Sequence, residues 1–167
     1  MSIALALDPG RTTGAAVGEL ENGRMYVRWS QHRFDHIQLW QQLELLKPDY
    51  LIIEEFEYRR GTRSREGLDL YPRELLGVAE LWCQMNKKPI YRQKASEGKS
   101  YFSNSTLQSN RCYDRGKPHA MDAVRHLLQW FTFGFGYQYN TSGFEPRALK
   151  KEPPKLKKLT VYRKPGQ

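Results

Sequence analysis

Cysteine is scarce in this chain of 167 residues, which contains only Cys83 and Cys112. The absence of any Cys-x-x-Cys pair argues against a cysteine-based zinc site. Cys83 lies in an apolar stretch, so we expect it to be a small core residue rather than half of a disulfide.

Long apolar runs are also missing. Stretches such as 50–53 and 130–133 fall far short of the roughly 20 residues that span a bilayer. The first residues lack the basic start and cleavage site of a signal peptide. These absences predict a cytoplasmic protein with no membrane partner. Hydrophobic residues still make up 39% of the chain, enough to fill one core and to disfavour a fully disordered protein.

Acidic residues are fewer than basic ones, and the basic excess is uneven. The formal charge is +9, of which residues 147–167, with eight Lys or Arg and one Glu, carry +7. A solvated tail of this kind can neutralise phosphates and displace counterions, but it lacks the amphipathic pattern that favours a membrane surface. We therefore predict a nucleic-acid partner, a compact domain at 1–138 and a basic, flexible tail at 139–167.

Apolar periodicity predicts alternating strands and helices. Continuous or alternating apolar residues predict five strands, at 3–7, 13–20, 25–33, 50–56 and 89–92. Helical spacing predicts three helices, at 37–46 after an N-cap at Asp35, at 73–86 and at 119–133. Segments 57–72 and 95–118 are expected to be irregular. The order β-β-β-α-β-α-β-α predicts an α/β domain with a five-stranded mixed sheet flanked by helices.

Acidic side chains follow two of the predicted strands. Asp8 ends the first strand and begins an Asp-Pro-Gly turn, and Glu54 and Glu55 follow the apolar start of the fourth. A carboxylate at the end of a buried strand is costly unless a positive charge compensates it. Because successive strand residues point to opposite faces, Glu54 and Glu55 cannot both face one site, and either is a candidate. The simpler alternative is an ordinary turn with solvated acids.

A polar pair opens the last predicted helix. His119 and Asp122 are three residues apart and therefore share a helix face. If this helix start meets the two strand ends, the clustered carboxylates repel one another unless cations bind between them. Oxygen-rich sites of this type suit Mg²⁺, with Mn²⁺ as a substitute. Two such ions about 4 Å apart can activate a water and stabilise the leaving oxygen in phosphodiester hydrolysis.

At these residues the chain resembles the RuvC-like Holliday junction resolvases of the ribonuclease H-like superfamily, especially the short phage-type members. The resemblance spans residues 3–133 in three blocks, Asp8-Pro9-Gly10 with Gly14, Ile53-Glu54, and His119-Ala120-Met121-Asp122-Ala123. It implies a ribonuclease H-like fold. It also implies that a pair of Mg²⁺ ions is held by four catalytic residues, Asp8, Glu54, His119 and Asp122. Some family members carry His, and others Asp, at the position of His119.

The resemblance further implies a magnesium-dependent endodeoxyribonuclease that acts as a homodimer on four-way junctions and other branched DNA. Its setting would be recombination and repair in a bacterial or phage-infected cytoplasm. Family members place basic residues after the fifth strand, where Lys94 and Lys99 stand here. An arginine-rich loop after the fourth strand could also grip phosphates, although a solvated loop is the plain alternative. Its basic residues are Arg59, Arg60, Arg63 and Arg65.

Other functions stay open. A related nuclease of broader specificity, such as a flap or debranching enzyme or an RNA-processing enzyme of the YqgF type, would use the same basic residues, since phosphate contacts carry no sequence information. A non-catalytic DNA-binding module would not need all four candidate ligands. Actin-like and sugar-kinase ATPases share the ribonuclease H-like core and a similar first phosphate loop, but they need two such domains, and this chain is long enough for one.

Overall fold

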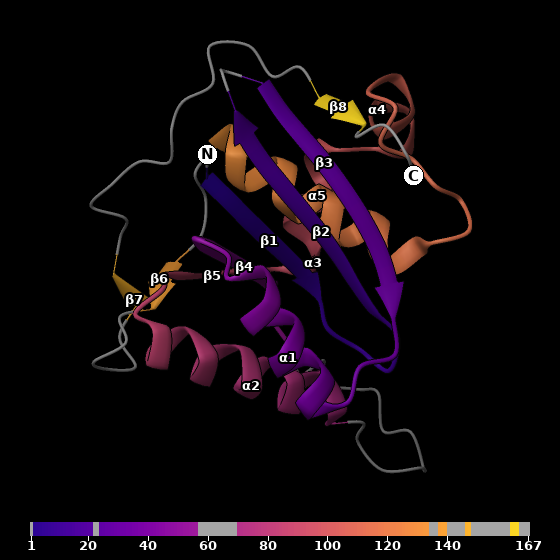
Figure 1. The fold of residues 1–167 in the computed structure, drawn as a ribbon. Coiled ribbons are helices and arrows are strands. Elements are labelled where there is room, and N and C mark those ends of the chain that lie inside the picture. Colours follow the sequence, from indigo (N-terminus) through magenta and orange to yellow (C-terminus); the bar gives the residue numbers. More distant parts are fainter. Residues whose placement is uncertain are drawn as a thin grey trace, which may run out of the picture.

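The computed structural model describes residues 2–21, 24–56 and 70–133, together with three short strands at 137–139, 146–147 and 161–163. Figure 1 shows a twisted mixed sheet with α1 and α2 on one face and α5 on the other. The five principal strands are β1 (Ser2–Asp8), β2 (Thr13–Glu21), β3 (Arg24–His32), β4 (Tyr50–Glu54) and β5 (Ile90–Gln93). The helices are α1 (His36–Leu46), α2 (Tyr71–Asn86), α3 (Ala95–Tyr101), α4 (Asn104–Ser109) and α5 (Pro118–Phe133).

The pairing of the principal strands confirms the predicted five-stranded mixed sheet. Strand β1 is central, antiparallel to β2 and parallel to β4, and β4 is in turn parallel to β5. Strand β3 pairs with β2 in the predicted hairpin arrangement. The α/β class and the order of strands and helices are therefore as the sequence predicts.

Three short strands extend this sheet beyond the sequence prediction. Strand β6 (Tyr137–Tyr139) lies beside β5, β7 (Pro146–Arg147) beside β6, and β8 (Val161–Arg163) beside β3. Two or three residues are too few to show an apolar period, which explains why they were not anticipated. The boundary between a domain at 1–138 and a tail at 139–167 stays a prediction, because most of the tail lies outside the described residues.

The expectation of an irregular segment at 95–118 was wrong, because α3 and α4 lie within it. Both helices are short and lack an apolar stripe, so their stability comes from local caps and from single buried contacts. The Ser103 hydroxyl caps α4 by accepting a hydrogen bond from Thr106 N at 3.2 Å, and Leu107 is fully buried. Helix α2 begins at Tyr71 rather than at residue 73, with Pro72 in its first turn, where a missing N–H leaves no helical hydrogen bond unmade.

The two faces of the sheet bury separate cores, and this decides where the strand ends point. Ala4, Ala6 and Ile52 pack in the core under α5, whereas Leu5, Leu7 and Ile53 pack under α1 and α2. Because side chains alternate along a strand, the residues at positions 8 and 54 face α5. Cys83 is buried in the core under α2, as expected, and both cysteines are free thiols.

Helix α5 approaches β2 closely because β2 carries only small residues beneath it. A Cβ atom on Gly14 would lie 2.0 Å from the carbonyl oxygen of His119, and one on Gly18 would lie 2.8 Å from a ring carbon of Phe131. Gly14 pairs with Asp8 across the β1–β2 ladder. The glycine therefore sets the beginning of α5 directly over the end of β1. None of the helices in the described part of the chain has the length and apolar character to cross a membrane.

We predict that Gly14→Ala destabilises the protein by roughly 1–3 kcal/mol, because the added methyl group collides with backbone that cannot rotate away. Chemical denaturation of the wild type and the variant measures this difference. Gly77→Ala is the matched control, since Gly77 lies in α2 with open space around it, and this change should stabilise by about 0.5–1 kcal/mol. Equal stability of Gly14→Ala and the wild type would contradict the close packing of α5 on β2.

Candidate functional site

The parallel strands β1, β4 and β5 end at the same edge of the sheet, and each ends in a polar residue. Leu7 is the register partner of Ile53, so Asp8 and Glu54 follow side by side at the ends of neighbouring strands. Glu54 in turn pairs with Gln93 at the end of β5. The strand register thus lines up two acids and an amide beneath α5.

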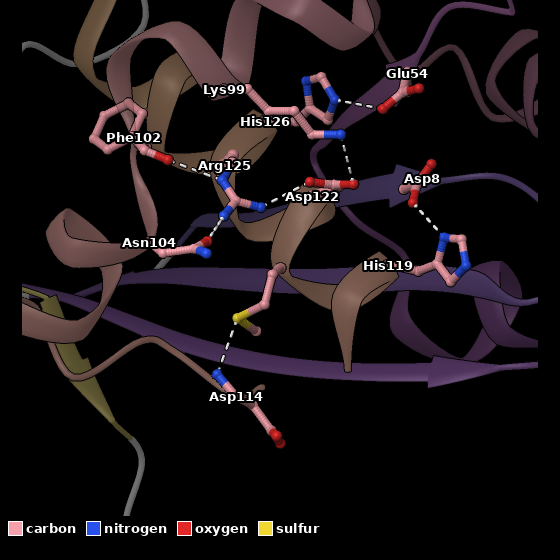
Figure 2. Close-up of polar contacts among 11 residues, drawn as sticks. Asp8, Glu54, Lys99, Phe102, Asn104, Asp114, His119, Asp122, Arg125 and His126 are labelled. Carbon is pink, nitrogen blue, oxygen red and sulfur yellow. Dashed lines mark hydrogen bonds and ion pairs between the residues drawn. The ribbon is translucent and has the colours of Figure 1, made fainter. Parts of the chain in front are cut away.

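Helix α5 brings its first residues to this edge (Figure 2). The His119 ring points toward Asp8, with its Nδ1 2.9 Å from Asp8 Oδ2. Asp122 lies one turn further along the helix and is held by two basic side chains. Its Oδ1 accepts a hydrogen bond from Arg125 Nη1 at 2.7 Å, and its Oδ2 lies 3.1 Å from Lys99 Nζ.

Glu54, rather than Glu55, faces this site. Its Oε2 lies 2.9 Å from Nε2 of His126, and Nδ1 of the same ring lies 2.8 Å from Gln93 Oε1. Glu55 follows in the chain, where its backbone N–H donates to the carbonyl oxygen of Gln93 at 2.7 Å. Alternation along the strand places the two acids on opposite faces.

Sequence reasoning missed Gln93, Arg125 and His126. The last two stand three and four residues after Asp122 and share its helix face, but they are buried, at 7% and 1% exposed. The available signal was a basic pair inside the otherwise apolar run from Ala123 to Leu128. A buried basic residue is rare unless it has a partner, so that pair could have pointed to acids nearby.

Burial and like charge together perturb the first acid of this group. Asp8 is only 8% exposed. Its burial and the neighbouring charge of Glu54 raise the pKa of Asp8 from 3.8 to about 6, against the opposing hydrogen bond and charge of His119. Asp122 adds a smaller contribution in the raising direction. These carboxylates are close enough to repel one another, which is the electrostatic condition for cation binding.

The carboxylate oxygens of this edge suit a hard divalent cation. Asp8 Oδ2 and His119 Nδ1, 2.9 Å apart, are hydrogen-bonded to each other, so the second ring nitrogen of His119 is the one left to face an ion. Across residues 2–21, 24–56 and 70–133, however, no three His, Cys, Asp or Glu side chains stand close enough together to hold an ion. Glu54 and Asp122 are bonded to His126, Arg125 and Lys99 instead. Complete coordination would therefore require these two acids to shift.

The predicted phosphate-binding residues are only partly placed. Lys99 lies in α3 beside Asp122, with 58% of its side chain exposed. Lys94 precedes α3 and is exposed, and its backbone N–H donates to Glu97 Oε2 at 3.1 Å. The arginine-rich loop lies outside the described residues, and its basic residues are Arg59, Arg60, Arg63 and Arg65.

Solved structures of resolvases share this fold. The structure of RuvC from Thermus thermophilus aligns with a TM-score of 0.60 and 16% identity, covering 82% of this chain and 99% of that one. The same protein in complex with a Holliday junction substrate gives a TM-score of 0.58 and 16% identity, over 76% and 91% of the two chains. The yeast mitochondrial Holliday junction resolvase Ydc2 gives 0.57 and 15%, over 77% of each chain.

These likenesses establish the fold as RuvC-like and ribonuclease H-like, as the sequence predicted. No protein-family model matches the sequence, and no curated protein does so either. The identities of 15–16% show the fold alone.

The pKa of Asp8 predicts a pH-dependent stability. Because the folded state holds the Asp8 proton more tightly than the unfolded state, this group lowers the free energy of unfolding as pH rises from about 4 to about 6. The shift corresponds to about 3 kcal/mol. Part of this falls below pH 4, so in chelator-containing buffer Asp8→Asn should gain about 2 kcal/mol relative to the wild type between pH 4 and pH 7, measured by urea denaturation at each pH.

Asp49→Asn is the control for this pH dependence. Burial opposes the effect, but hydrogen bonds from Ile3 N and Lys88 hold the pKa of Asp49 below its ordinary value. The stability from Asp49 is consequently lost only below about pH 4, so this variant should differ from the wild type by a constant amount between pH 5 and pH 7. A constant difference for Asp8→Asn as well would show that Asp8 ionises like a solvated acid.

Proposed function

We propose that this protein is a divalent-metal-dependent endonuclease that cleaves branched DNA and resolves four-way junctions. The observation that carries this proposal is the gathering of Asp8, Glu54, His119 and Asp122 at one edge of a RuvC-like sheet, with the pKa of Asp8 raised by burial and by the charge of Glu54. A site that only stabilised the fold would have no reason to bring three carboxylates together, because their repulsion opposes folding.

In the proposed mechanism these four residues hold Mg²⁺. The ions, when bound, activate a water and stabilise the leaving oxygen of the phosphodiester. His119 keeps Oδ2 of Asp8 oriented through its Nδ1, and 47% of its side chain is exposed at the solvent side of the site. Lys99, with 58% of its side chain exposed, would be available to a phosphate oxygen if a cation replaced it beside Asp122.

A branched-DNA substrate is supported by charge and by fold. The chain has a net charge of +9, concentrated in residues 147–167, and positive charge that neutralises phosphates provides most of the affinity for DNA. The Thermus thermophilus relative has been solved with a Holliday junction substrate. We extend that substrate class to this chain, and with it a place in DNA recombination and repair.

Cleavage of a synthetic four-way junction tests the activity directly. We expect paired, symmetrical nicks in the presence of Mg²⁺ and none with excess chelator. Asp8→Asn and Asp122→Asn should each slow cleavage by about 100-fold or more, the scale on which loss of one preorganised charged group slows an enzyme. Both should still bind the junction in a gel-shift assay, because phosphate contacts dominate affinity.

Asp49→Asn again provides the matched change, since Asp49 bonds Ile3 N at the opposite end of β1, and it should cleave like the wild type. Cleavage at the wild-type rate by either site variant would contradict the assignment of the ligands. Flap, duplex and RNA substrates belong in the same experiment. Equal rates on all of them would favour the nuclease of broader specificity, and binding without any cleavage would favour the non-catalytic module.

We also propose that the protein is a homodimer, so that two sites can act on the two sides of a junction. Helices α1 and α2 expose large apolar side chains, Ile37, Leu45, Leu81 and Met85, at 69%, 80%, 52% and 65%. Apolar side chains that gather on one surface mark interaction sites, and we propose that these four form part of the dimer interface.

The dimer proposal is tested by light scattering coupled to size-exclusion chromatography. Leu45→Glu combined with Met85→Glu should convert a dimer into a monomer by placing charge on the apolar surface. Gln41→Glu combined with Gln84→Glu adds the same charge to exposed positions of the same helices and should leave the dimer intact. A wild-type protein that elutes with the mass of a monomer would refute the dimer.

A further inference from the structure

Two polar side chains that the proposed cleavage does not use are buried between β5 and α5. Gln93 and His126 are each 1% exposed. Their neighbours along α5, Ala123, Leu127 and Trp130, are apolar and fully buried. Burying an imidazole and an amide costs free energy unless both are hydrogen-bonded, and apolar side chains of similar size would fill the same space.

These two residues form a chain of hydrogen bonds that ends on Glu54. Gln93 Oε1 lies 2.8 Å from His126 Nδ1, and His126 Nε2 lies 2.9 Å from Glu54 Oε2. Figure 2 shows the ring of His126 pointing from α5 toward the Glu54 carboxylate. An ionised carboxylate can only accept, so Nε2 carries the proton and donates to Glu54 whichever way the Gln93 amide is turned.

The contact on Glu54 differs from those on Asp122. The positively charged side chains of Lys99 and Arg125 contact Oδ2 and Oδ1 of Asp122. They therefore compete with a metal cation for the carboxylate oxygens of Asp122. An imidazole can donate to Glu54 while it is neutral, provided that the Gln93 amide turns its NH2 group, rather than Oε1, toward Nδ1. Its hydrogen bond uses Oε2 and leaves Oε1 as the oxygen that can face an ion.

We propose that His126, held in place by Gln93, is a positioning residue that orients Glu54 for metal binding. This inference rests on the proposed function, because it takes Glu54 to be a ligand. Ligating carboxylates that are hydrogen-bonded from behind lose less freedom when the ion binds, and removal of such partners weakens metal affinity by about 10–100-fold.

Calorimetric titration of the full-length protein with Mn²⁺, without DNA, provides a readout that does not depend on cleavage. His126→Leu removes the donor and fills the buried space with an apolar side chain. We expect its Mn²⁺ affinity to fall by about 10–100-fold, while its melting temperature stays at or above that of the wild type. His126→Gln can place an amide N–H near the position of Nε2 and should restore affinity to within about threefold.

A second comparison uses the Glu54→Gln variant to distinguish positioning of Glu54 from a general effect of His126 on the fold. Glu54→Gln already lacks the carboxylate that His126 would orient, so adding His126→Leu to it should not weaken Mn²⁺ binding further. Unchanged affinity in the single variant His126→Leu would overturn the inference, as would an equal loss in both backgrounds. If His126→Leu fails to fold, the Mn²⁺ affinities of His126→Gln and His126→Asn are compared instead. The Asn amide reaches only the position of Nδ1, so it should not restore the contact with Glu54. Equal Mn²⁺ affinities of these two variants would overturn the inference. A wild type that binds no Mn²⁺ would overturn the proposed function itself.

Discussion

Helix α5 reaches the edge of the sheet only because β2 has no side chain where the helix crosses it. At Gly14 the backbone of the strand lies against the His119 carbonyl, at a distance that any Cβ atom would occupy. That contact fixes the height of α5 above β1 and so the separation of His119 from Asp8. The same helix then carries Asp122, Arg125 and His126 over the ends of β1, β4 and β5. Close packing at Gly14 thus sets where α5 brings its polar residues to an edge that the strand register has lined up.

Three carboxylates lie at this edge of the sheet, and each contacts a different partner side chain. Asp8 meets the half-exposed imidazole of His119, Glu54 meets the buried imidazole of His126, and Asp122 meets two cationic side chains. The pKa of Asp8 remains raised despite its imidazole partner, with burial as the first cause. A divalent cation would reduce the remaining repulsion between these carboxylates. The same side-chain arrangement can therefore be stable without a metal and still favour metal binding.

The sequence was sufficient where chemistry stands at the end of a regular element. Asp8 and the Glu54–Glu55 pair follow apolar strands, and His119 opens an amphipathic helix, so strand ends and helical spacing pointed to the segments that meet. The same reasoning failed at α3 and α4, which are too short to have a period. It also missed Arg125 and His126, which share a helix face with Asp122 but stand within an otherwise apolar run. The choice between Glu54 and Glu55 also needed the structure. Ile52 packs in the core under α5, and Glu54, two residues further along the strand, points to the same face. The arginine-rich loop and most of the basic tail remain predictions.

The central claim is that the polar edge formed by Asp8, Glu54, His119 and Asp122 binds divalent cations. Crystals grown with Mn²⁺ test it most directly, because the anomalous scattering of manganese locates each ion without reference to activity. We expect anomalous peaks within coordination distance of Asp8 and Glu54, with the Lys99 ammonium displaced from Asp122. Saturating Mn²⁺ that leaves this edge without an anomalous peak, or that produces peaks only elsewhere on the protein, would contradict the claim.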